Sequence, residues 1–146
     1  MANDTIDTLN SFLRGEIAAV ETYRQALEKL GTKAEATTLD ECLRSHEQRV
    51  AMLTSEVRMR GGEPARGSGP WGAFAKLMEG GAKLFGERTA IAALEEGEDH
   101  GRDDYKRDAS KLEADARVFI DSRIVPEQLR THRAMSMLKK RLEAAA

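Results

Sequence analysis

The sequence is poor in several kinds of residue, and each shortage excludes a class of protein. Cysteine occurs once, at Cys42, so no disulfide can form within the chain, as suits a reducing compartment. No apolar run approaches the ~20 residues of a membrane-spanning helix. The first residues lack the basic and then apolar stretches of a secretory signal. The 23 basic and 25 acidic side chains nearly cancel, which excludes a general electrostatic grip on nucleic acid or on an anionic membrane. We therefore expect a cytoplasmic protein with neither of these partners.

Apolar residues recur at steps of three and four over most of the chain, which is the spacing of one face of an α-helix. Short turns join the first two helical segments and the last two, so each pair is expected to form an antiparallel hairpin. The link between the second and third segments is long enough to run the length of a bundle. The sequence predicts an all-α four-helix bundle of two hairpins with one long crossover, although an up-down bundle with an inserted loop stays open. The predicted domain spans residues 1–146, with helices over 4–30, 33–60, 82–109 and 114–143 and a crossover over 61–81.

Four ionisable residues stand where these helical stripes require a core residue, one in each predicted helix. The two histidines end near-identical motifs, "ECLRSH" and "EQLRTH", and each glutamate precedes a tyrosine by seven residues, which indicates a duplicated hairpin. Residues at equal distance from a turn face each other in a hairpin. Each glutamate is therefore expected level with its histidine, all four in one layer. The four are Glu16, His46, Glu98 and His132, and the stripe of the last helix reads Val118, Val125, Leu129, His132, Met135, Leu138 and Leu142.

Buried carboxylates and imidazoles need partners, because an uncompensated charge in a core is costly. A divalent ion of iron, manganese or zinc is one solution, since these ions accept oxygen and nitrogen ligands. Glu95, one turn before Glu98, would add a third carboxylate, although a solvated glutamate in the acidic run "EEGED" is its more frequent role. Tyr23 and Tyr105 are expected to support the ligands or to pack as core rings. A metal-free network of Glu and His side chains is the alternative. No catalytic residue and no organic cofactor is predicted.

Two segments carry a resemblance to a known superfamily. "EIAAVETYRQAL" resembles the first helix of ferritin-like and rubrerythrin-like proteins, and "LEEGEDHGRDDY" is similar to their third. With "GGEPARGSGPWGAF" in the crossover, the whole chain is similar to a group of small bacterial ferritin-like proteins classed as a domain of unknown function. The resemblance implies a ferritin-like bundle. In that superfamily the second and fourth helices carry Glu-x-x-His, but here Leu43 and Leu129 stand three residues before the histidines. The resemblance thus implies the shell of a di-iron centre without its bridging carboxylates.

Three functions follow from these expectations. The first is a ferritin-like protein that binds a divalent transition metal in its core, in metal handling or a stress response. The second is a non-enzymatic structural or interaction bundle with a metal-free Glu/His network. The third is a rubrerythrin-like di-iron oxidoreductase, which the two leucines disfavour. Enzymatic activity therefore stays undecided. A homo-oligomer is a further expectation, because Trp71 and Phe74 could form an exposed apolar surface.

Overall fold

The protein is an all-α four-helix bundle, as the sequence predicts. A computed structural model describes residues 2–31, 34–69 and 86–145. Three rods are single helices, whereas the fourth is built from three consecutive helical pieces that follow a 3₁₀ turn. None of the described helices combines the length and the apolar character needed to cross a membrane. The elements are α1 (Ala2–Leu30), α2 (Ala36–Met59), α4 (Glu87–Asp108), the 3₁₀ turn Ala109–Lys111, α5 (Ala114–Phe119), the π-helical turn Ile120–Ile124 and α6 (Val125–Ala144).

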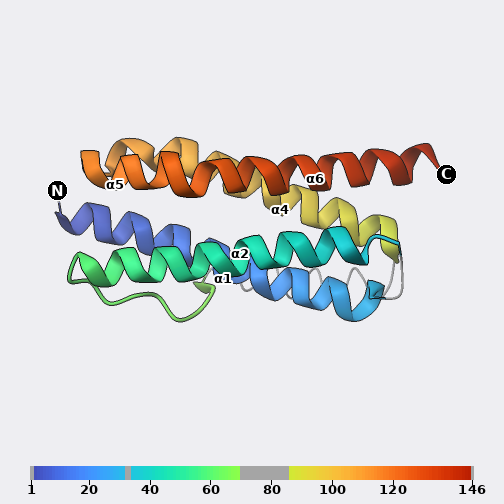
Figure 1. The fold of residues 1–146 in the computed structure, drawn as a ribbon, viewed down its shortest axis with the longest axis horizontal. Helices are drawn as coiled ribbons and strands as arrows, with labels where there is room; N and C mark the ends of the chain where they lie inside the picture. Colours follow the sequence, from blue (N-terminus) through green and yellow to red (C-terminus); the bar gives the residue numbers. More distant parts are fainter. Residues whose placement is uncertain (1, 32–33, 70–85, 146) are drawn as a thin grey trace.

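The four rods form two antiparallel hairpins, α1 with α2 and α4 with α6 (Figure 1). α2 and α4 run in the same direction, so α2 ends at one end of the bundle and α4 begins at the other. This arrangement agrees with the predicted long crossover. Its described part, residues 60–69, contains no α-helix and is anchored by Asn10, whose side chain donates to the carbonyl of Glu63 and accepts from the amide of Ala65. The rest of the crossover, with Trp71 and Phe74, lies outside the described residues.

Two apolar clusters fill the two ends of the bundle and leave a polar layer between them. One cluster gathers side chains such as Leu39 and Ile91 around the α1–α2 turn. The other gathers Leu9, Leu53, Ile120 and others near the opposite end. The apolar surface removed from water in these clusters supplies the main driving force for folding, at about 25 cal/mol per Å². The buried ionisable residues of the middle layer must therefore stabilise one another enough to offset the free-energy cost of their desolvation.

The predicted stripe of the fourth rod is wrong from Val118 to His132. Val118 is 65% exposed and Leu129 is 50% exposed, so neither belongs to the core. The reason is helical geometry: the six residues from His132 to Leu138 turn by roughly 600°, which falls about 120° short of two full turns. The preceding π-helical turn, next to Pro126 with its missing amide hydrogen, shifts the register further. The side chains that face inward instead are Ile120, Ile124, Gln128, Thr131, Met135 and Leu138.

Candidate functional site

Three of the four predicted site residues meet in the middle layer. His46 on α2 lies between the two glutamates, with Nδ1 2.8 Å from Oε1 of Glu16 on α1 and Nε2 2.8 Å from Oε2 of Glu98 on α4. All three side chains are buried. The depth at which Glu16 and His46 meet agrees with the equal counts from the turn at Gly31. One imidazole therefore joins two carboxylates from two other helices.

The two tyrosines are bonded crosswise to the same carboxylates. The hydroxyl of Tyr23 on α1 donates to Oε2 of Glu98 on α4, at 2.6 Å. The hydroxyl of Tyr105 on α4 donates to Oε2 of Glu16 on α1, at 3.2 Å. Each glutamate is thus bonded to the tyrosine of the other helix, not to the tyrosine seven residues after it in its own helix. Tyr23 also stacks on His46, with ring centroids 5.1 Å apart. Both tyrosine hydroxyls therefore hold the carboxylates of the layer in place.

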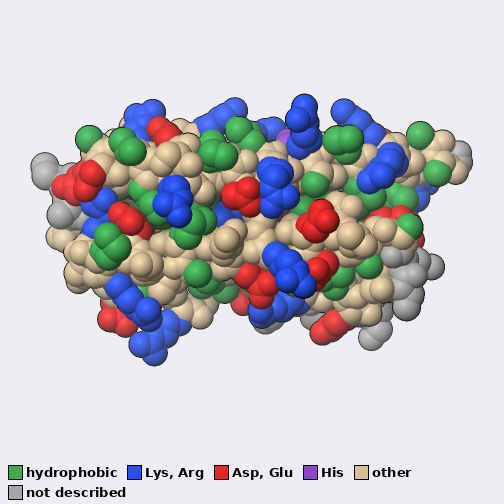
Figure 2. All heavy atoms as spheres, viewed as in Figure 1, with side chains coloured by type: hydrophobic (Ala, Val, Ile, Leu, Met, Phe, Trp, Pro, Cys, Tyr) green, Lys and Arg blue, Asp and Glu red, His purple; other side chains and the backbone are tan. Residues whose placement is uncertain are grey.

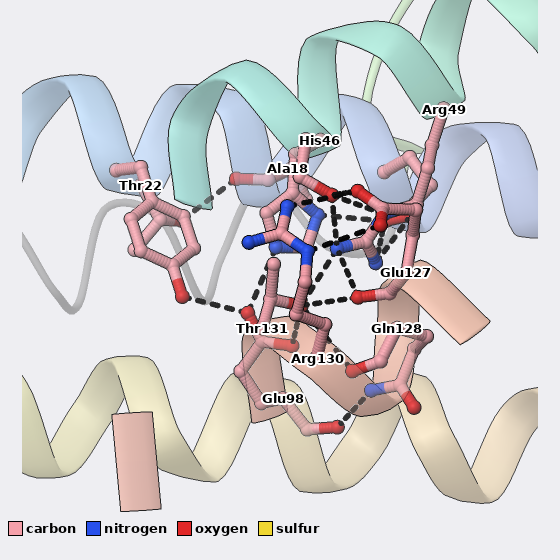
Figure 3. A network of polar contacts seen from close by, with 12 residues as sticks. Ala18, Thr22, His46, Arg49, Glu98, Glu127, Gln128, Arg130 and Thr131 are labelled. Carbon is pink, nitrogen blue, oxygen red and sulfur yellow. Dashed lines mark hydrogen bonds and ion pairs between the residues drawn. The ribbon is translucent and has the colours of Figure 1, made fainter. Parts of the chain in front are cut away.

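The central cation of this layer is Arg49, which the sequence reasoning missed. Arg49 is fully buried, at 0% exposure, and its Nη1 lies 3.2 Å from Oε2 of Glu16. Its Nη2 donates to the hydroxyl of Ser45 at 3.0 Å, to that of Thr131 at 2.6 Å and to the carbonyl of Glu127 at 3.3 Å. Figure 3 shows Arg49 and His46 entering the network together from α2. Arg49 fits the helical phase of the buried α2 stripe as well as its neighbour Val50 does. An arginine at a position of the buried stripe was therefore the sequence signal that could have identified it.

The fourth helix contributes neutral groups to the layer. The hydroxyl of Thr131 donates to Oε1 of Glu98 at 2.8 Å, while it accepts from Arg49. The amide of Gln128 donates to the backbone carbonyl of Glu98 at 2.9 Å. Gln128 and Thr131 have the i, i+3 spacing expected for Glu-x-x-His. These two residues stand one position before Leu129 and His132, the pair that the "EQLRTH" motif suggests.

The structure keeps the remaining candidates out of the layer. His132 is half-buried at the surface, where its Nε2 lies 2.5 Å from Oδ1 of Asp99 and 3.2 Å from Arg102. The prediction that His132 faces Glu98 in the core is therefore wrong, because Thr131 occupies the inward position. Glu95 is partly exposed, and its closest polar contact is the hydroxyl of Ser136 at 3.4 Å. The two histidine motifs look alike in sequence but are not equivalent in the fold.

The charges of the network balance only if His46 is protonated. Burial alone would lower the pKa of His46, but the carboxylates of Glu16 and Glu98 raise it above its ordinary value. Burial would likewise raise the pKa of each glutamate. Arg49 and His46 outweigh that effect for Glu16, and His46 is the main cause that lowers the pKa of Glu98 to about 2. Two carboxylates thus face one guanidinium and one imidazolium, and the net charge of the layer is zero.

A small cavity adjoins the network between α1 and α4. Its volume is about 60 Å³, enough for a few water molecules. Glu16, Glu98 and both tyrosines line it, and about half of its other lining residues are small. Those residues are Ser11, Gly15, Ala18, Ala19, Gly97 and Gly101.

These side chains, as arranged, do not fit a metal centre. A ligating imidazole presents a bare nitrogen to the ion, but both nitrogens of His46 are held by carboxylates. Arg49 places a fixed positive charge beside Glu16, where a divalent ion would be repelled. Within residues 2–31, 34–69 and 86–145, no group of three or more His, Cys, Asp or Glu side chains is arranged to hold a metal ion.

The fold and the layer together define a class: a four-helix bundle whose core is divided by a buried, charge-balanced polar network. Comparison with known sequences places the chain within a family. It belongs to the family described as Domain of unknown function (DUF2383), whose profile matches residues 4–111. No curated protein and no solved structure matched the chain. The resemblance to a domain of unknown function is thereby confirmed, whereas the relation to ferritin-like proteins stays a prediction.

Proposed function

We propose that this protein is a non-enzymatic helical bundle that acts as a structural or interaction module, and that its core network works without a metal ion. The observation that carries the proposal is the buried guanidinium of Arg49, which donates to three different helical rods: Glu16 on α1, Ser45 on its own helix α2 and Thr131 on α6. A metal ion in such a bundle would serve to neutralise the buried carboxylates. Here Arg49 and protonated His46 already neutralise them.

The chemistry of the inward positions supports the same function. Di-iron chemistry uses several carboxylates that bridge two ions. On α2 the position one turn before His46 is Leu43, and the inward positions of α6 are Gln128 and Thr131. Glu16 and Glu98 are the two fully buried carboxylates of the layer among the residues that the structure describes, while Glu127 is partly exposed and paired with Arg130. An oxidoreductase of the rubrerythrin type is therefore poorly supported.

A divalent iron, manganese or zinc ion bound by Glu16, His46 and Glu98 is the competing candidate. The observation that favours it is the convergence of three side chains of ligand type from three helices. For the ion to bind, His46 would have to lose one of its carboxylate partners. Arg49 would have to withdraw from Glu16 at the same time. Metal handling would then become the function to test next.

Elemental analysis after metal loading separates the two candidates. The purified protein is incubated with Fe²⁺, Mn²⁺ or Zn²⁺, desalted and analysed, with a Glu16→Gln variant as the matched control. We expect far less than one ion per chain in both proteins, and for each protein the same melting temperature with and without added metal. A stoichiometric ion in the native protein that is lost in the variant would overturn the metal-free proposal.

A further inference from the structure

The outer face of α6 carries a basic surface with two exposed apolar side chains within it. Leu129 is 50% exposed and Met137 is 56% exposed. Exposed cations lie around them on the same face of the helix, because steps of four and seven residues return to nearly the same direction. In Figure 2, Lys and Arg side chains follow the upper edge of the molecule, over α6 and the turns that precede it. We define the α6 basic face by Leu129, Arg130, Arg133, Met137, Lys140 and Arg141.

Three cations of this face have no carboxylate partner among the residues that the structure describes. Arg130 is paired with Glu127 at 2.9 Å, and that pairing lowers the pKa of Glu127 to about 2. For Arg133, Lys140 and Arg141, by contrast, the described part of the chain provides no carboxylate at ion-pair distance. Between residues 128 and 142 the sequence holds five Lys and Arg side chains and no Asp or Glu. This cationic stretch stands out in a chain whose total charge is −2.

The composition of the face indicates what kind of partner it fits. Protein–protein interfaces combine apolar contacts with charged and polar ones, and Leu129 and Met137 among exposed cations offer both. A second copy bound α6 to α6 would bring like charges together, which disfavours it. Two half-exposed apolar side chains without an aromatic residue give a membrane little to hold. Nucleic acid would make no use of the two apolar side chains.

We infer that the α6 basic face is a docking surface for an acidic amphipathic segment of another protein. Apolar side chains of the partner cover Leu129 and Met137, and its carboxylates pair with Arg133, Lys140 and Arg141. This inference deepens the interaction role proposed above and rests on it. Peptide binding and metal binding are measured separately, so either can fail while the other stands.

Fluorescence anisotropy with a defined probe tests the inference. The probe is a fluorescein-labelled amphipathic peptide of leucine, alanine and glutamate, compared with the same peptide carrying lysine in place of glutamate. We expect the acidic peptide to bind at least about tenfold more tightly, and more weakly as salt is added. The triple variant Arg133→Glu/Lys140→Glu/Arg141→Glu should weaken that binding by about tenfold or more, since three charge pairs contribute together.

A second triple variant controls for the change in overall charge. Arg58, Arg88 and Lys106 are exposed cations on α2 and α4, outside the α6 basic face. Their joint reversal to glutamate should leave peptide binding within about twofold, and circular dichroism verifies that both variants fold. Equal loss in the two variants, or no binding of the acidic peptide, overturns the inference. So does binding of anionic phospholipid vesicles or RNA through the face in preference to the peptide, or self-association that the first triple variant abolishes.

Discussion

Replacing Arg49 with methionine is the perturbation that best separates a charge-balanced network from an ordinary core. Methionine fills much of the volume but removes the cation and its hydrogen bonds to Glu16, Ser45 and Thr131. The layer then carries two carboxylates against His46 alone. Loss of one partner from a buried ion pair costs roughly 3–5 kcal/mol. For a chain of 146 residues at about 3 °C per kcal/mol, the melting temperature should fall by about 10–15 °C.

The assay is urea unfolding at pH 7, with two comparison variants. Arg44→Met removes an arginine whose side chain is 77% exposed and pairs with Asp40, so it should change the free energy of unfolding by less than about 0.5 kcal/mol. The double variant Arg49→Met/Glu16→Gln restores neutrality, since Glu98 and His46 then balance. It should be more stable than Arg49→Met by roughly 1–3 kcal/mol. If Arg49→Met costs under about 1 kcal/mol and the double variant recovers nothing, the network does not depend on charge balance.

Three further predictions concern the same layer. The pKa of Glu98 is about 2 in the fold against an ordinary 4.5, so its ionised form stabilises the protein above about pH 4.5, and this contribution, roughly 3 kcal/mol, is lost as the pH falls toward 2. In unfolding curves from pH 5 to 2, Glu98→Gln should flatten the acid limb, whereas Glu143→Gln at the exposed end of α6 should leave it unchanged. The fold raises the pKa of His46, so the stability that its protonated form contributes is complete below the ordinary pKa of 6.5 and is lost as the pH rises through the pKa in the fold. ¹H–¹⁵N NMR of the imidazole ring should find both nitrogens protonated at pH 7, and one unprotonated nitrogen would contradict the charge balance. Thr131→Val removes the hydroxyl between Arg49 and Glu98 and should cost about 1–3 kcal/mol in urea unfolding; a cost no larger than that of the exposed Ser122→Ala would rule out a role for this hydroxyl in the network.

The fold could be predicted because local and long-range signals agree. Helical spacing of apolar residues identifies the four rods, and Gly31 marks the first turn, after which counting along the hairpin places Glu16 beside His46. The end of α1 at Leu30 agrees with the prediction, and the end of α2 at Met59 differs by one residue. α2 begins at Ala36, although the spacing predicts residue 33; residues 32 and 33 lie outside the described residues.

The site was only partly predictable because its inward positions are not marked by residue type. The likeness of "ECLRSH" and "EQLRTH" favours equivalent histidines, but the register of α6 is set by Met135 and Leu138, which turn Thr131 inward and His132 outward. A step of six residues does not return to the same face of a helix, so His132 and Leu138 cannot both face inward. The burial of Arg49 could not be predicted because arginine is seldom fully buried. Here it depends on hydrogen bonds to Glu16, Glu127 and Thr131, which lie far from Arg49 in the sequence.

A crystal structure determined after soaking in Mn²⁺, with anomalous scattering data, tests the central claim most directly. We expect the guanidinium of Arg49 beside Glu16, His46 between the two glutamates, and no anomalous peak in the layer. A peak at bonding distance from Glu16, His46 and Glu98, with Arg49 displaced, would contradict it and establish the metal-binding alternative.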